Sequence, residues 1–171
     1  KLRYLDGQIS INMKSVKRSK KNALVAEPDL AYAQAGHMLS AEKLLDITRS
    51  QTEEPLNRIH TFRKGLKRKS LDRLKEATGL DHQTLAFALS VSTKTLQRTE
   101  DFDVVQSEKM YELADLYATG IAYFGVEGFR GWMDRPLFRL GNHRPLELLD
   151  VSEGIAMLRT EIMRMQHGVA V

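Results

Sequence analysis

Hydrophobic residues recur every three or four positions along most of the chain after residue 55, which is the spacing of one face of an α-helix. Near the C-terminus this spacing predicts a helix that begins near Ser152, is capped there by Asp150 or Ser152, and stops at Gly168. A longer apolar stripe predicts an amphipathic helix that Ser107 caps and Gly125 ends, followed by a short helix over residues 126–133. No segment shows the alternation typical of a strand, so the sequence predicts an all-α fold.

Three short helical segments follow one another in the middle of the chain. The first ends at Gly79, Asp81 caps the second, and Ser92 caps the third, which runs over residues 93–98. Ser90 and the residue after it make a tight turn between the second and third segments. This spacing is that of a helix-turn-helix motif, in which the last segment reads DNA.

Polar side chains on the third segment are candidates for contacts with DNA. They lie on the face opposite the apolar Leu96, and they are Thr93, Lys94, Gln97 and Arg98. Glutamine can pair with adenine, and lysine or arginine can contact guanine or a phosphate. A basic cluster precedes the motif and is either a solvated face or a set of phosphate contacts: Arg63, Lys64, Lys67, Arg68 and Lys69. Lys67, Arg68 and Lys69 are its candidate contacts with DNA. A helical motif that serves only for packing is the alternative interpretation.

Composition and charge limit the class of protein. The 171 residues are 42% apolar and 28% charged and contain no cysteine, which fits a globular cytoplasmic protein without disulfides or thiol catalysis. No apolar run approaches the length of a membrane span, so no membrane association is expected. The net charge of +4 is uneven, because residues 1–28 hold seven Lys and Arg against two Asp and Glu, whereas residues 106–171 hold seven against nine. This asymmetry indicates a basic end that meets nucleic acid and an opposite end that meets protein.

These patterns predict four segments along the chain. Residues 1–28 form a basic flexible arm, and residues 29–55 form a helical N-terminal extension. Residues 56–105 form the helix-turn-helix domain, and residues 106–171 form a small helical C-terminal domain.

Nothing in the sequence indicates catalysis. The five histidines show no pairing at helical spacing and no neighbouring ligand set, so neither a metal site nor a cofactor is expected. No glycine-rich phosphate loop follows a strand pattern, and acidic residues are dispersed along helix faces. The sequence therefore predicts a binding protein and not an enzyme.

Two stretches resemble the Xre/MbcA/ParS family of bacterial antitoxins. The C-terminal stretch resembles the family's C-terminal domain through an ordered set of residues: Trp132, Pro136, Leu140-Gly141, Pro145-Leu146, Leu148-Leu149, Ser152-Glu153-Gly154 and Gly168. Asn142 stands where the family usually has a second glycine, and asparagine also tolerates a positive φ. Residues 89–98 resemble the family's helix-turn-helix core, with Ser90 in place of the usual glycine.

The resemblance implies a type II antitoxin that silences a cognate toxin and represses its own operon by binding promoter DNA. Family members are cytoplasmic homodimers that pair with a RES-type toxin, an enzyme that consumes NAD. It also implies that the C-terminal end enters or covers the toxin's NAD site, through Arg159, Arg164, Met165, Gln166, His167, Gly168 and Val169. A frayed terminus is the alternative for this end. For the whole chain the alternative is a helix-turn-helix transcriptional regulator without a toxin partner.

Overall fold

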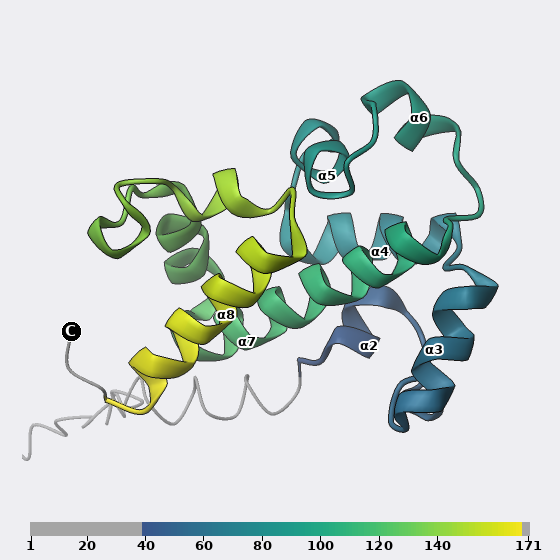
Figure 1. The fold of residues 1–171 in the computed structure, drawn as a ribbon, viewed down its shortest axis with the longest axis horizontal. Coiled ribbons are helices and arrows are strands. Elements are labelled where there is room, and N and C mark those ends of the chain that lie inside the picture. The colour runs from purple at the N-terminus through teal and green to yellow at the C-terminus, as the bar shows by residue number, and fades with distance from the viewer. Residues whose placement is uncertain (1–38, 169–171) are drawn as a thin grey trace, which may run out of the picture.

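The computed structural model describes residues 39–168, and every regular element in this range is helical (Figure 1). The α-helices are α2 (Ala41–Leu45), α3 (Pro55–Lys64), α4 (Arg68–Thr78), α5 (His82–Ala88), α6 (Thr93–Arg98), α7 (Val104–Asp134) and α8 (Ser152–Gln166). Three 3-10 helices join them: η1 (Arg49–Gln51), η2 (Phe138–Leu140) and η3 (Pro145–Leu148). The predicted all-α fold is confirmed. The expected basic arm, the first part of the expected extension and Val169 lie outside the described residues.

The long helix α7 is the element on which the other helices pack. Helices α2, α3, α4 and η3 contact it, and α8 runs beside it, where Arg159 pairs with Asp115 and the Tyr123 hydroxyl donates to the Met165 carbonyl oxygen (Figure 1). Leu113, Ala114 and Leu116 of α7 are fully buried, and they belong to one continuous core that also takes in residues of α4, α5 and α8. The two halves of the described chain therefore share one hydrophobic core.

The expected start of α7 at Ser107 is wrong, because the helix begins three residues earlier. Asp103 is the cap: its carboxylate accepts a hydrogen bond from the Gln106 backbone at 2.8 Å, and the Gln106 side chain accepts one from the Asp103 backbone. Ser107 lies inside the helix, where its buried hydroxyl accepts from the Leu66 N–H at 2.8 Å. Its hydroxyl holds the segment before α4 against α7, a contact between residues far apart in sequence.

Gly125 interrupts α7 at the position where the sequence predicted a break. Its φ of 71° and ψ of 169° are not helical, and the chain resumes a helical course up to Asp134. After the break Phe129 folds back against the first part of the helix, where its ring stacks with those of Phe124 and Trp132. A Cβ atom at Gly120 would lie 2.2 Å from the Phe129 ring, so only glycine leaves room for this aromatic cluster.

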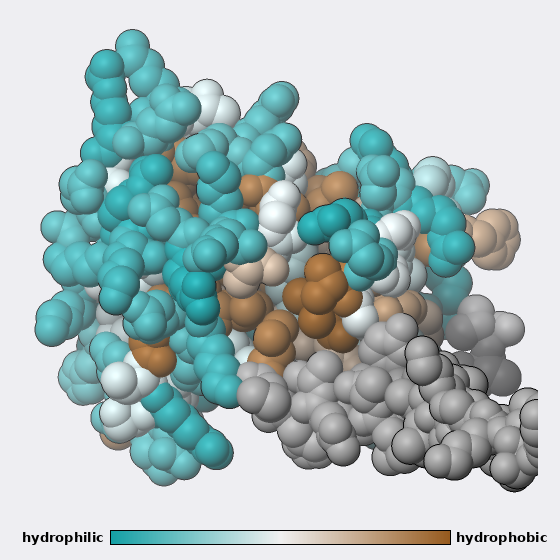
Figure 2. Space-filling view, turned by 180° about the vertical axis from the view of Figure 1, so that it is seen from behind, coloured by the Kyte–Doolittle hydropathy of each residue, from teal (hydrophilic) through white to brown (hydrophobic). Residues whose placement is uncertain are grey.

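Part of the apolar surface stays open. On the face shown in Figure 2, hydrophobic side chains gather near the middle of the molecule, while hydrophilic side chains cover much of the remainder. A cavity of about 240 Å³ opens between the α4–α5 junction and α7, with Phe129, Arg130 and Tyr117 among its lining residues. Burial raises the pKa of the Tyr117 hydroxyl far above its ordinary value, so this group stays neutral.

The packing at Gly120 gives a prediction with a matched control. Gly120→Ala should lower the free energy of unfolding by about 1–3 kcal/mol, because the methyl group overlaps the Phe129 ring. Gly131→Ala in the same helix should raise it by about 0.5–1 kcal/mol, because nothing lies within 4 Å of that position and alanine favours the helix. Urea denaturation measures both changes, and equal effects at the two glycines would contradict the proposed packing.

Candidate functional site

The helix-turn-helix is built from local caps, as the sequence predicted. The Asp81 carboxylate accepts from the Thr84 N–H at 2.7 Å at the start of α5, and the Ser92 hydroxyl accepts from the Thr95 N–H at 3.0 Å at the start of α6. Ser90 lies between the two helices with a φ of 55°, the left-handed conformation that a glycine adopts more easily. The turn therefore keeps the geometry that a glycine would give, although its residue is serine.

Helix α6 is anchored by one buried residue and exposes the rest. Leu96 is fully buried, and the four predicted DNA contacts on this helix are all solvent-exposed: Thr93, Lys94, Gln97 and Arg98. Neither Lys94 nor Arg98 belongs to an ion pair within residues 39–168. This face thus presents two unneutralised cations beside a glutamine amide, a set of groups that can meet base edges and phosphates.

The two lysines of the basic cluster at the start of α4, Lys67 and Lys69, have acidic partners in the structure. Lys67 pairs with Asp101, and Lys69 pairs with Asp46 at 2.5 Å, where the lysine holds the pKa of the Asp46 carboxyl below its ordinary value. Both lysine side chains remain largely exposed, so these pairs contribute little stability and leave the cations accessible.

Arg68 has a different position from its two neighbours. Its side chain is only 21% exposed; it pairs with Asp72 at 3.1 Å and donates a hydrogen bond to the carbonyl oxygen of Leu96. This contact joins the first turn of α4 to the last turn of α6, where carbonyl groups lack helical partners. Arg68 therefore holds α6 against the rest of the domain.

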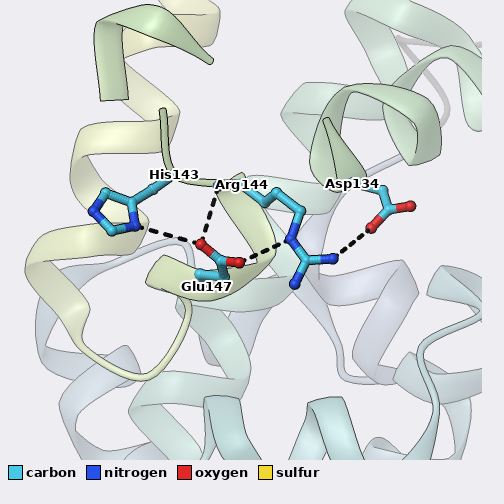
Figure 3. Close-up of polar contacts among 4 residues, drawn as sticks. All are labelled: Asp134, His143, Arg144 and Glu147. Carbon is cyan, nitrogen blue, oxygen red and sulfur yellow. Dashed lines mark hydrogen bonds and ion pairs between the residues drawn. The ribbon is translucent and has the colours of Figure 1, made fainter. Parts of the chain in front are cut away.

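A polar network closes the connector between α7 and α8. The Glu147 carboxylate accepts from Arg144 Nε at 2.8 Å and lies 3.4 Å from His143 Nδ1, while Arg144 Nη1 lies 3.5 Å from an Asp134 oxygen (Figure 3). The hydrogen bond from Arg144 lowers the pKa of the Glu147 carboxyl. Asn142 has a φ of 64°, so the tolerance of positive φ expected from the sequence is used. The network ties the connector to the end of α7.

The start of α8 depends on Gly154. A Cβ atom there would lie 2.0 Å from the carbonyl oxygen of Leu148, so only glycine lets the helix pack directly against η3. The expected cap at Asp150 or Ser152 is wrong: Val151 occupies the cap position, and no side chain caps the helix. The Asp150 carbonyl oxygen is instead a partner of Lys109 and Ser90, two residues far from it in sequence.

The predicted toxin-binding residues on α8 are in different environments. Arg159 pairs with the half-buried Asp115 of α7 at 2.8 Å, and burial raises the pKa of that aspartate in spite of the arginine. Arg164 lies 3.5 Å from the buried Glu161, which also pairs with Arg139 of the connector at 3.2 Å. Met165 is partly buried against the core, whereas the last three described residues are exposed: Gln166, His167 and Gly168.

One exposed apolar residue beside α8, Phe138, was missed by the sequence analysis. Phe138 of η2 is 87% exposed, and Met157 and Met163 on the outer side of α8 are each more than two-fifths exposed. A shallow hollow of about 310 Å³ lies between η2 and α8, with Arg139 and Arg164 among its lining residues. Periodicity gave no sign of Phe138, because a single phenylalanine in a turn-rich stretch belongs to no stripe.

Comparison with known proteins places the chain in a family. Residues 58–115 match the antitoxin Xre-like helix-turn-helix domain, and residues 119–168 match the antitoxin Xre/MbcA/ParS C-terminal toxin-binding domain. The Prs ADP-ribosylating antitoxin of Sphingobium sp. (strain YBL2) is 26% identical over 128 residues, which cover 67% of this chain and 80% of that protein.

The chain belongs to the Xre/MbcA/ParS antitoxins and is a distant homologue of the Sphingobium protein. It is an antitoxin that binds a toxin through its C-terminal domain, and it is not an enzyme. Among the residues that the structure describes, no helix is both long and apolar enough to cross a membrane.

The position of Arg68 predicts a structural effect. Arg68→Ala should lower the free energy of unfolding by about 1–2 kcal/mol, because it leaves the end of α6 without its charged donor. Lys67→Ala should change it by no more than about 0.5 kcal/mol, since that ion pair is exposed. Chemical denaturation of both variants tests this, and a destabilisation by Lys67→Ala as large as that by Arg68→Ala would refute the assigned role.

Proposed function

We propose that this antitoxin neutralises a RES-type toxin that consumes NAD, and that it represses its own operon by binding the promoter as a homodimer. The observation that carries the proposal is the pair of exposed surfaces on one core: the polar face of α6 and the outer side of α8. Neutralisation of the toxin and repression of the operon both take place in the cytoplasm. The match to a toxin-binding domain favours this function over that of a regulator without a toxin.

The identity of the toxin is argued from two sources. The family resemblance implies a RES-type partner, and the name of the Sphingobium relative refers to ADP-ribosylation. An ADP-ribosyl group comes from NAD, so both point to a partner with an NAD site. Such a site accepts flat rings and phosphates in a cleft that a narrow peptide end can fill.

The end of α8 has the shape that this role needs. The helix is held on its inner side by the buried Ile155, Leu158 and Ile162, so its outer side and its end remain free for a partner. Gly168 has a φ of 63° with nothing within 4 Å of a Cβ atom, which leaves the backbone open to close approach. His167 adds a planar group that can stack or donate a hydrogen bond within such a cleft.

The DNA contacts are assigned to the exposed face of α6. Gln97 is the candidate for base recognition, and Lys94 and Arg98 are candidates for guanine or phosphate contacts. Lys67 and Lys69 are candidates for further phosphate contacts, because their ion pairs are exposed and exchangeable. Arg68 contributes indirectly by holding α6.

A dimer follows from the small size of α6. A single six-residue helix makes few contacts, so two copies are needed at half-sites about one turn of DNA apart. The hydrophobic side chains gathered on the face in Figure 2 support this, since such patches are typical of interfaces.

The DNA assignment is tested by replacing the two central polar residues of α6. Lys94→Ala combined with Gln97→Ala should weaken binding to the operon's own promoter by at least about tenfold at physiological salt, because base and phosphate contacts are both lost. Arg135→Ala removes one positive charge from an exposed position in the C-terminal domain and serves as the control. Fluorescence anisotropy measures the affinities, and wild-type binding by the double variant would show that α6 is not the reading helix.

The role of the C-terminal end is tested by truncation. Removing residues 166–171 should leave the protein folded and able to bind its promoter, since none of the described residues among them is buried. In cells that carry the toxin, the truncated chain should no longer prevent the loss of NAD. Cellular NAD is measured beside the full-length protein, and full protection by the truncated chain would move the inhibitory surface to the connector, residues 132–149.

Phe138 gives an independent test of the connector as a contact surface. Phe138→Ser should weaken toxin binding by about 2 kcal/mol or more, the usual effect of removing a central aromatic anchor, with no loss of stability. Val105→Ser removes another exposed apolar side chain, which is 63% exposed and lies at the start of α7, and should leave toxin affinity unchanged. Calorimetric titration decides this, and equal affinities for the two variants would remove Phe138 from the interface.

A further inference from the structure

The side chain of Ser90 joins the helix-turn-helix to the C-terminal domain. Its hydroxyl donates to the Asp150 carbonyl oxygen at 3.1 Å and lies 2.7 Å from Lys109 Nζ, which donates to it. The Lys109 ammonium also donates to the same Asp150 carbonyl oxygen. The three residues come from the α5–α6 turn, from α7, and from the segment before α8. We name them the Ser90 cluster.

These contacts give a reason for serine at a position that favours glycine. Glycine adopts a φ of 55° without strain, whereas serine at that conformation costs free energy. Glycine, however, has no hydroxyl and can form neither of the two hydrogen bonds. Serine is therefore less favourable than glycine for the backbone at this position, but its hydroxyl links the helix-turn-helix to the C-terminal domain.

The Ser90 cluster lies at the start of both functional helices. Ser90 is two residues before Ser92, whose hydroxyl caps α6. Asp150 is two residues before the first residue of α8, a helix that packs tightly on η3 through Gly154. A displacement of α8 therefore moves the Asp150 carbonyl group. Movement of that group shifts its hydrogen-bond partner Ser90, in the turn that fixes the position of α6.

A carboxylate oxygen without a hydrogen-bond partner within residues 39–168 lies one helical turn from Lys109 on the same helix. Glu112 is three residues further along α7, at a spacing that brings lysine and glutamate side chains within reach. One of its carboxylate oxygens is buried and has no hydrogen-bond partner among residues 39–168. An unpartnered buried carboxylate oxygen is unfavourable, so an arrangement in which Lys109 turns to Glu112 competes with the one observed.

We propose that the Ser90 cluster couples operator binding by α6 to toxin binding by α8, with Ser90 and Lys109 as positioning residues. The inference rests on the proposed function. With Lys109 bound to Ser90 and Asp150, the α5–α6 turn and the start of α8 move as one unit. Toxin binding displaces Asp150, Lys109 turns to Glu112, and the turn before α6 is released. Toxin binding then changes the affinity for operator DNA, and operator binding changes the affinity for toxin by the same factor.

The first measurement uses the free protein. Lys109→Met keeps the length of the side chain and removes its donors, so amide hydrogen exchange should become faster both in residues 89–93 and in residues 148–152. Lys43→Met removes an exposed lysine that forms no ion pair within the described range and should change neither segment. Unchanged exchange in both segments of Lys109→Met would show that the cluster does not hold them together.

The second measurement is the ratio of operator affinities with and without saturating toxin. In the wild type the two affinities should differ by about fivefold or more, which is the lower end of typical allosteric coupling. In Ser90→Gly and Lys109→Met the operator affinities with and without toxin should differ by no more than about twofold. Ser90→Gly keeps the turn conformation, so its separate affinities for operator and for toxin should stay within about threefold of wild type.

The outcomes separate this inference from the function on which it rests. Absence of operator binding or of toxin binding in the wild type would overturn the proposed function itself. If the wild type binds both with a ratio of one, or if Ser90→Gly and Lys109→Met keep the wild-type ratio, the function stands and the coupling role of the Ser90 cluster is overturned.

Discussion

Burial of α7 is the interaction on which the rest of the structure depends. Helices α2, α3 and α4 pack on α7, and so do η3 and α8, which pairs with Asp115 of α7 through Arg159, so both proposed binding surfaces rest on one hydrophobic core. Hydrophobic burial is the main favourable contribution to folding, and here it is shared between the two matched domains. Helix α6, for which we propose contacts with DNA, and α8, for which we propose contacts with the toxin, are thereby fixed relative to the same support.

Specific contacts then set the positions of the short elements on this support. Arg68 holds the end of α6, the absence of a side chain at Gly154 lets α8 begin against η3, and the pair of Arg159 with Asp115 joins α8 to α7. The contacts of Arg68 and Arg159 join residues that are distant in sequence, whereas Gly154 packs against the nearby Leu148. The outer surfaces of α6 and α8 remain free of such contacts, which leaves them available for binding.

Features encoded by neighbouring residues could be predicted from the sequence. The caps Asp81 and Ser92, the stop at Gly79 and the break at Gly125 all depend on a few adjacent residues, and the structure has them where they were expected. Features that depend on distant residues could not be predicted. Ser107 looked like a helix cap and is a buried link to Leu66 instead.

The candidate site shows the same division between local and distant information. The exposure of the polar face of α6 followed from the position of Leu96 alone. The partners of Arg68, the exposure of Phe138 and the bonds made by the Ser90 hydroxyl appear only when the fold brings separate segments together. Family resemblance supplied the class of protein, and the structure supplied the contacts that distinguish supporting residues from accessible ones.

The central claim is that one core carries two separate binding surfaces. Amide hydrogen exchange of the protein alone, with operator DNA, and with the toxin encoded by the adjacent gene tests it most directly, because burial of a surface slows exchange there. The account predicts that DNA slows exchange chiefly in residues 92–98 and that toxin slows it chiefly in residues 136–168. Slower exchange in residues 92–98 with toxin, and none in α8, would contradict it.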